Sequence, residues 1–324
     1  MFDRPIRCAL VGLGRFGANY GRILPSIPDL ALSAVCDPSS AARARAGAGP
    51  RVVADVSELD LTQLDAAIIA APTPTHGPLT LAALHAGLHV LVEKPLAQTA
   101  AEASAIVVAA AERERVVLAG QLTLHHPGVQ RLRALVGEGA LGPIVRVVAT
   151  RTSSGALHRT EPQRAHPNEP ALSSLGPHDV ANVLHVLGED APLRVDRASQ
   201  ATLDEAELRA SSGAIDIHMR WSRRATRAHR ALLVVGQKGE AELDEVAGRL
   251  RVRLRSSTHV EELAPPRPLL DEQLRHFAAC VRGSEFPRPR LADAARVVTI
   301  LHEAARLAEA QDRDAHQSRA LSPA

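Results

Sequence analysis

Two short motifs carry most of the chemistry that this sequence can support. The first is the glycine run Gly12-Leu13-Gly14-Arg15-Phe16-Gly17, and the second is Glu93-Lys94-Pro95. The glycine run indicates where a dinucleotide binds, and the second motif places a lone lysine where the far end of that dinucleotide should lie. A later segment, Leu175-Gly176-Pro177-His178-Asp179, adds a histidine. Either motif alone is weak evidence, but the combination indicates a redox enzyme.

The glycines of the first motif have separate tasks. Gly12 lets the chain turn sharply out of a strand, Gly14 lets the backbone approach a pyrophosphate, and Gly17 lets the next helix pack closely on the sheet. Asp37 ends the following strand, where an acidic partner of the ribose is expected. A carboxylate there accepts both ribose hydroxyls and repels a 2′-phosphate, which favours NAD over NADP. The alternative is that Asp37-Pro38 only opens a turn.

The lysine of the second motif has a restricted backbone. A residue before proline is confined to extended conformations, so the direction of the Lys94 side chain is fixed. In an open parallel sheet, ligands lie beyond the carboxyl ends of the strands, so Ala71–His76 and Glu93–Pro95 should flank the cofactor. The alternative for Lys94 is a solvated surface lysine, which the strand-end position and the proline disfavour.

The elements that must position these motifs alternate between strand and helix up to Gly120. Apolar runs and turn residues predict strands at Ile6–Val11, Ala31–Cys36, Arg51–Ala54, Ala66–Ala71, His89–Glu93 and Val116–Gly120. Helices are predicted at Phe16–Leu24, Ser39–Ala46, Thr75–Ala86 and Thr99–Glu112. This alternation predicts an α/β fold, a Rossmann-type doubly wound parallel sheet with right-handed crossovers.

The pattern changes after Gly120 and predicts an α+β domain with an open, largely antiparallel sheet. Strand-like runs extend over Ile144–Thr152 and from Leu193 to Arg255, and Ser153–Pro170 is irregular. Helices are predicted at Pro127–Val136, Leu172–Leu187, Leu270–Arg282 and Leu291–Ala310. We therefore expect a dinucleotide-binding domain at 1–121, a substrate-binding and oligomerisation domain at 122–310 whose closing helices could pack back on the first, and a flexible tail at 311–324.

Bulk properties exclude several classes of protein. The chain has 324 residues, 45% hydrophobic and 23% charged, and 38 basic against 36 acidic residues give a net charge of +2. This balance argues against nucleic-acid binding, and no apolar run reaches the ~18 residues of a membrane span. Three widely separated cysteines fit neither a disulfide framework nor a zinc site, so we expect a cytoplasmic protein without a metal.

Taken together, the motifs resemble the Gfo/Idh/MocA family, named for glucose–fructose oxidoreductase and inositol dehydrogenase. The matching segments are Val11–Gly17, Ala71-Pro72-Thr73 with His76, Glu93-Lys94-Pro95, Gly142-Pro143-Ile144, Leu175–Asp179 and Val234–Glu240. The resemblance implies NAD(P)-dependent oxidation or reduction of a sugar, cyclitol or related alcohol. It also implies a second domain whose open sheet forms an oligomer interface, as a homodimer or homotetramer.

The resemblance also assigns residues to roles. In that family the lysine and the later histidine act on the reacting hydroxyl, and these positions match Lys94 and His178. Pro177 suits the first position of a helix, which would put His178 in the first turn, where the positive helix end favours a neutral, proton-accepting imidazole. His125-His126 and His185 have weaker claims. The expected cofactor-binding residues are Gly12, Gly14, Arg15, Phe16, Gly17, Asp37, Ala71, Pro72, Thr73, His76, Glu93 and Lys94.

One position departs from the family pattern. Many members carry an aspartate four residues before the histidine, where this chain has Ser174. Serine can hydrogen-bond but supplies no charge, so use of a three-residue catalytic set is in doubt. Asp179 does not replace it, because we expect Asp179 to cap the helix or face outward. Arg151, Arg159 and Arg164 could bind an anionic substrate, although a surface role is the simpler interpretation.

The sequence thus predicts an NAD-dependent oxidoreductase that interconverts a secondary alcohol and a ketone on a sugar, cyclitol or sugar-derived substrate. Lys94 and His178 would handle the proton. Two alternatives stay open. One is an NAD(P)-binding regulatory or scaffold protein with little turnover, and the other is a glycosidase that uses tightly bound NAD in a redox cycle.

Overall fold

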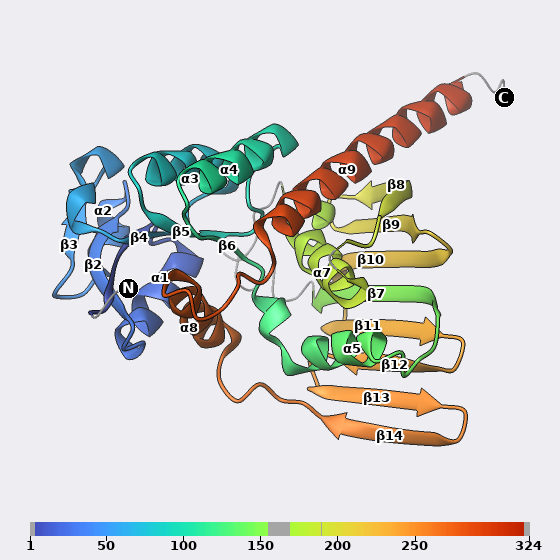
Figure 1. Cartoon of the computed structure of the whole chain (residues 1–324). Coiled ribbons are helices and arrows are strands. Elements are labelled where there is room, and N and C mark those ends of the chain that lie inside the picture. Colours follow the sequence, from blue (N-terminus) through green and yellow to red (C-terminus); the bar gives the residue numbers. More distant parts are fainter. Residues whose placement is uncertain (1–3, 155–168, 189, 321–324) are drawn as a thin grey trace. The chain divides into compact units, whose positions relative to one another are not determined.

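The structure, a computed structural model, describes residues 4–154, 169–188 and 190–320. Contacts divide the chain into two compact units, each with its own sheet (Figure 1). The first comprises the residues up to Leu122 together with Arg267–Val298, and the second comprises Thr123–Pro266 and the residues from Thr299 onward. The last boundary falls inside helix α9 (Leu291–Ala320).

The first unit contains six parallel strands in the order β3-β2-β1-β4-β5-β6. Their bounds are β1 Ile6–Val11, β2 Leu30–Cys36, β3 Arg51–Val53, β4 Ala66–Ile69, β5 His89–Glu93 and β6 Val117–Gly120. The strand order reverses between β1 and β4, which opens a crevice at the carboxyl ends of the strands. The predicted doubly wound sheet is confirmed.

Helices cover both faces of this sheet (Figure 1). They are α1 Arg15–Ile23, α2 Ser40–Arg43, α3 His76–His85, α4 Ala100–Glu112 and α8 Leu269–Val281, with 3₁₀ turns at Leu24–Ser26, Val56–Glu58, Leu61–Gln63 and Thr73–Thr75. Alternate strand residues point to opposite faces. Leu10 and Leu91 therefore pack with α1 and α8, whereas Val90 and Val92 pack with α3, α4 and the start of α9.

Two helices differ in length from their predictions. The helix expected at Ser39–Ala46 is only Ser40–Arg43, because Gly47 and Gly49 take positive φ angles of 74° and 122° just beyond it. By contrast, α9 continues to Ala320, ten residues beyond the expected Ala310, since no proline or glycine interrupts the sequence there.

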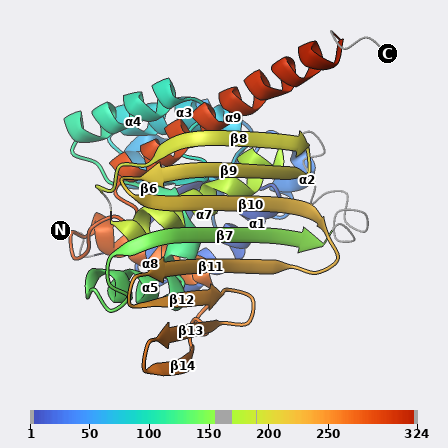
Figure 2. The ribbon, with the colours of Figure 1, turned by 90° about the vertical axis from the view of Figure 1, so that its right-hand side faces the viewer.

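The second unit contains an eight-stranded sheet in the order β14-β13-β12-β11-β7-β10-β9-β8 (Figure 2). Its strands are β7 Ile144–Ser154, β8 Arg194–Thr202, β9 Glu205–Ser212, β10 Ile215–Ala225, β11 His229–Gly236, β12 Gly239–Asp244, β13 Arg249–Leu254 and β14 Ser257–Glu262. Only β7 and β10 pair in parallel, so the largely antiparallel sheet is confirmed.

One face of this second sheet carries a 3₁₀ turn and two helices (Figure 1), namely η5 Leu122–His125, α5 Pro127–Gly137 and α7 Ala171–Leu187. Along β10 the side chains of Ile217, Met219 and Trp221 are buried, whereas the residues between them are partly or fully exposed. This alternation directs the apolar residues of β10 toward one face. Among the described helices, none is long and apolar enough to cross a membrane.

Candidate active site

The glycine motif forms the turn from β1 into α1, and its three glycines face different surroundings. Gly12 has a φ of 95°, and a Cβ added there would lie 2.6 Å from the carbonyl oxygen of Ala70. A Cβ at Gly17 would lie 1.9 Å from the carbonyl oxygen of Gly12, but one at Gly14 would meet no atom within 4 Å. Gly12 and Gly17 therefore permit close backbone packing, whereas Gly14 leaves space that a ligand can fill.

The start of α1 suits an anionic group in that space. Gly14 is the N-cap residue, no side chain caps the helix, and the first turn holds no acidic residue. The first amide groups of a helix lack partners within the helix and carry its positive dipole end. The residues present thus fit the pyrophosphate of a dinucleotide, with Arg15 and Phe16 in the first turn of the helix.

Asp37 follows β2 and is tied to the glycine motif. Its Oδ2 accepts a hydrogen bond from the Leu13 amide at 2.6 Å, and its Oδ1 accepts one from the Ser39 amide at 2.8 Å. The residue is 8% exposed. A carboxylate has about four acceptor positions, so it can still accept from ribose hydroxyls.

Two arginines lie near this carboxylate but are engaged with backbone oxygens. Arg43 donates through Nη1 to the carbonyl oxygens of Asp37 and Pro38, at 2.8 and 2.9 Å. Arg45 donates through Nη2 to the carbonyl oxygen of Leu13 at 3.0 Å. The sequence pattern does not indicate these contacts, because both side chains return to the end of a strand, Arg43 from the last residue of α2 and Arg45 from just beyond it.

The segments that leave β4 and β5 are joined by His76. Its Nδ1 lies 2.7 Å from the carbonyl oxygen of Pro95, and its Nε2 lies 2.9 Å from that of Ala71. The ring is 1% exposed. Burial lowers the pKa of His76, and the charge of Lys94 acts in the same direction, against the two carbonyl groups, which raise it. His76 therefore lies between the two loops, where a neutral imidazole donates a hydrogen bond to one of the two carbonyl oxygens.

The carboxylate of Glu93 points into the first unit. Tyr20 donates its hydroxyl to Glu93 Oε1 at 2.7 Å, and Gln273 of α8 donates to the Tyr20 hydroxyl at 2.8 Å. Glu93 Oε2 accepts from the Lys94 amide at 3.2 Å. Burial raises the pKa of Glu93, because the charged carboxylate is removed from solvent. Glu93 thus anchors the backbone from which the partly buried Lys94 extends.

The candidate residues of the first unit therefore meet at one sheet edge. Gly14, Asp37, Ala71 and Lys94 leave four different strands, and parallel strands place all of these exits at the carboxyl edge. Pro72 and Thr73 lie in the same turn as Ala71, at the start of the 3₁₀ segment that leads into α3.

His178 belongs to the second unit, and the expectation for its helix is wrong. Helix α7 begins at Ala171, so Pro177 and His178 are its seventh and eighth residues and lie beyond the first turn. The positive helix end therefore does not act on this imidazole as expected. Pro177 supplies no amide to the carbonyl of Ser173, which removes one helical hydrogen bond just before His178. Ser174 lies four residues before His178, on the same side of the helix.

Asp179 neither caps the helix nor faces outward, and Arg151 is not a surface residue. Asp179 is 3% and Arg151 4% exposed. Arg151 binds both carboxylate oxygens of Asp179, with its shortest contact at 2.7 Å, and reaches Glu245 at 3.0 Å. Trp221 donates its indole N–H to Asp179 Oδ2 at 2.8 Å. The expectation failed because the partners come from strands far away in the sequence.

The sequence of the first unit matches a known protein family. Residues 6–121 match the sequence model of GFO_IDH_MocA, described as an oxidoreductase family with an NAD-binding Rossmann fold. The resemblance to the Gfo/Idh/MocA family is thus confirmed for residues 6–121.

Curated relatives of this chain include an inositol 2-dehydrogenase of Saccharopolyspora erythraea, 36% identical over 161 residues, or 48% of each chain. A UDP-N-acetylglucosamine 3-dehydrogenase of Acidithiobacillus ferrooxidans is 33% identical over 128 residues, or 40% of this chain and 41% of the relative. The chain thus spans about half the length of the curated relatives that it matches, or less.

Solved structures extend the similarity in fold beyond the Gfo/Idh/MocA domain. A structure of the A. ferrooxidans enzyme covers 96% of this chain and 99% of its own, with a TM-score of 0.82 at 24% identity. A 3-ketoreductase from Actinomadura kijaniata, in complex with NADP and TDP-benzene, covers 94% of this chain and 98% of its own, with a TM-score of 0.81 at 20% identity. At these identities the likeness shows the fold alone.

The other candidate residues have structural partners or lie outside the description. His126 caps α5 by accepting from the Gly128 amide at 3.0 Å, and His185 lies 3.0 Å from Gln130. The predictions for Arg159 and Arg164 fall outside the described residues.

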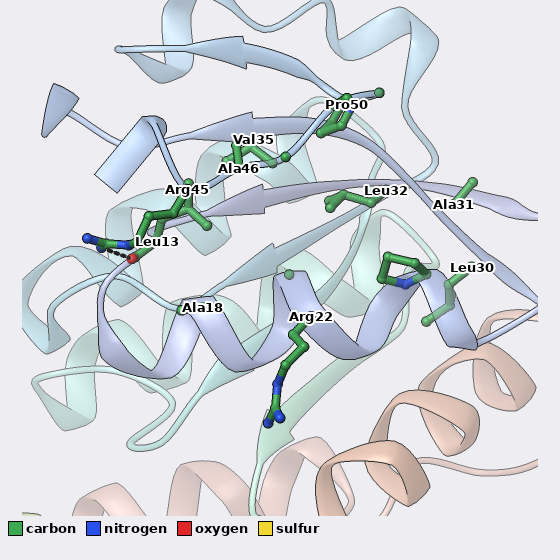
Figure 3. A pocket seen from close by; sticks show the side chains of 15 residues that line it. Leu13, Ala18, Arg22, Leu30, Ala31, Leu32, Val35, Arg45, Ala46 and Pro50 are labelled. Carbon is green, nitrogen blue, oxygen red and sulfur yellow. Dashed lines mark hydrogen bonds between the residues drawn. The ribbon is translucent and has the colours of Figure 1, made fainter. Parts of the chain in front are cut away.

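A groove of about 540 Å³ lies along α1 and β2 (Figure 3). It is lined by Leu13, Ala18, Leu30, Leu32, Val35 and Ala46, with Arg22 and Arg45 as its charged residues, and it opens where α2 ends early. It contains neither Asp37 nor Lys94, but it reaches the glycine motif at Leu13.

Proposed function

We propose that this protein is an NAD-dependent oxidoreductase that interconverts a secondary alcohol and a ketone on a sugar, cyclitol or sugar-derived substrate. The observation that carries the proposal is the meeting of the open Gly14 turn, the buried Asp37 and the anchored Lys94 at one sheet edge. The names of relatives support the substrate class, since they include inositol and sugar 3-dehydrogenases.

The residues of this chain would divide the chemistry as follows. The first turn of α1 and Gly14 bind the pyrophosphate, and Asp37 binds the ribose hydroxyls. The nicotinamide supplies the acceptor or donor of hydride when it is bound. Lys94 Nζ orients the reacting hydroxyl and stabilises negative charge that develops on its oxygen, while His178 accepts or returns the hydroxyl proton. The proposal requires that the two units bring Lys94 and His178 to the same hydroxyl.

Two features bear on the choice of cofactor. Asp37 favours NAD because its carboxylate would repel a 2′-phosphate. Arg43 and Arg45 lie near enough to attract such a phosphate, but they donate to backbone carbonyl oxygens. We therefore propose NAD as the preferred cofactor.

The test is turnover of sugars, sugar acids and cyclitols, including inositol and UDP-N-acetylglucosamine, with NAD or NADP. Lys94→Ala and His178→Ala should keep cofactor affinity and lose at least about 100-fold in kcat, the scale of a positioned acid–base group. The matched controls are the exposed Lys238, the only other lysine in the sequence, and the exposed His302. Full activity in Lys94→Ala would contradict the mechanism.

The same panel, extended with glycosides, separates the alternatives. A regulatory protein would bind NAD and turn over none of the panel, whereas a glycosidase with a closed redox cycle would cleave glycosides and accumulate no NADH.

We also propose that copies of the chain associate through the eight-stranded sheet. Val148 and Leu233 pair in register between β7 and β11, and both lie partly exposed on this sheet.

A further inference from the structure

The polar groups beneath α7 form one buried cluster that ties the helix to its sheet. We define the anchor cluster as Arg151, Asp179, Asn182, Trp221 and Glu245. We propose that the anchor cluster fixes α7 in rotation and in position along the helix axis. It thereby sets the direction of the His178 side chain, and its members are positioning residues. This inference rests on the proposed function, because it explains what orients His178, the residue to which that function assigns the proton transfer.

The partners of Asp179 are Arg151 and Trp221, two residues of the sheet. Arg151 and Trp221 are paired residues of the neighbouring strands β7 and β10, so both present their side chains at the same level of the sheet. Asp179 receives three contacts from Arg151, between 2.7 and 3.1 Å, and one from Trp221 at 2.8 Å. A bidentate guanidinium–carboxylate pair has a planar geometry, so it restricts rotation more than a single charge would.

A second anchor of α7 lies at Asn182, three residues after Asp179. Asn182 is 1% exposed, accepts from the hydroxyl of Thr123 at 2.9 Å, and donates to Glu245 at 3.4 Å. Asp179 follows His178 directly, and Asn182 follows it by four residues, one helical turn further on. Asp179 and Asn182 share one face of the helix, about one turn apart, so together they hold both its rotation and its position along the axis.

The charge of the Arg151 guanidinium also holds the anchor cluster together. Burial alone would lower the pKa of Arg151, but Asp179 and Glu245 outweigh burial and raise it, so the guanidinium stays charged. Glu245 accepts from both Arg151 and Asn182 and thereby joins the two anchors. Removing Arg151 would leave the buried carboxylates of Asp179 and Glu245 without the guanidinium that joins them, which is costly in a buried site.

The turn of α7 before His178 is weakened by a proline, so the anchors are needed to hold it in place. Pro177 removes the hydrogen bond that would otherwise close the turn before His178. Because a misplacement of about 1 Å in a catalytic group can cost about 100-fold in rate, control of this turn matters for the proton transfer.

The experiment compares Asp179→Asn, Arg151→Lys and Arg151→Met with two controls. Arg146→Met removes an ion pair from the same strand, but one whose side chains are 59% and 44% exposed. Leu250→Ala removes a buried side chain of β13, an outer strand of the sheet, and so lowers stability without touching the cluster. Each variant is assayed with NAD and with inositol or UDP-N-acetylglucosamine as the probe, and by thermal unfolding.

We expect Asp179→Asn and Arg151→Met to lower kcat at least about tenfold while the Kd for NAD changes less than about twofold, since the site for NAD is in the other unit. Arg151→Lys should recover part of the loss. The nitrogen-15 signals of the His178 ring, assigned with His178→Gln, should shift in Asp179→Asn and stay unchanged in both controls.

Two results would overturn the inference. One is unchanged kcat and unchanged ring signals in folded Asp179→Asn, and the other is an equal loss of kcat in Leu250→Ala at equal stability. If His178→Ala itself keeps full activity, the proposed function has failed. If His178→Ala is inactive and Asp179→Asn is not, only this inference has failed.

Discussion

Acid should destabilise the first unit through His89, the first residue of β5. The Val116 amide donates to His89 Nδ1 at 3.1 Å, so this nitrogen must be free of a proton in the folded protein. Burial lowers the pKa of His89 from 6.5 to about 4, and the charge of Arg115 adds to the effect. Between these pH values the unfolded chain binds more protons than the folded one, so stability is complete above pH 6.5 and is lost as the pH falls toward 4.

The size of the loss follows from the two pKa values. Between pH 8 and pH 5 the free energy of unfolding should fall by about 2 kcal/mol through His89 alone, and by roughly 1 to 2 kcal/mol when solvent screening of a partly exposed ring is allowed for. His76, His126 and His276 also have pKa values lowered by burial and act in the same direction. A variant must therefore isolate His89.

His89→Asn is that variant, because its amide oxygen can still accept from the Val116 amide but does not titrate in this range. Urea unfolding at pH 8 and pH 5, followed by circular dichroism, measures the difference. Trp221 is the only tryptophan and lies in the second unit, so its fluorescence reports that unit separately. The exposed His85→Asn is the control. The reasoning is refuted if His89→Asn loses as much stability between these pH values as the unmodified chain.

Three further outcomes are expected. Gly17→Ala should cost about 3 kcal/mol in unfolding free energy, because its Cβ would lie 1.9 Å from a carbonyl oxygen, whereas Gly14→Ala should keep the fold and weaken NAD binding in calorimetry. Asp37→Ser should lower the ratio of kcat/KM for NAD over NADP by about 10- to 100-fold, the worth of a charged hydrogen bond. Leu233→Glu should shift light-scattering mass toward the monomer. Equal NAD affinity in Gly14→Ala, an unchanged ratio in Asp37→Ser, or an unchanged mass would contradict these expectations.

The first unit could be predicted closely because its determinants are local. β5 has the expected bounds His89–Glu93, and the helix expected at Thr99–Glu112 is α4, Ala100–Glu112, with Thr99 as its cap. Each cofactor-site segment also begins where a buried strand ends, and a sheet of parallel strands brings such ends together without further information. The inward turn of Glu93 could not be predicted, since its partners Tyr20 and Gln273 lie 73 residues before it and on the distant α8.

The second unit was less predictable for a physical reason that bears on function. Arg151 and Asp179 are separated by 28 residues, and Arg151 and Glu245 by 94. Charged residues in a sequence are usually exposed, so periodicity gives no sign that these three are buried together. The resemblance to the family predicts a role for His178, but in our proposal the direction of its side chain depends on partners outside the motif. Changes at Arg151 or Glu245 could therefore alter the chemistry while every recognisable motif stays intact.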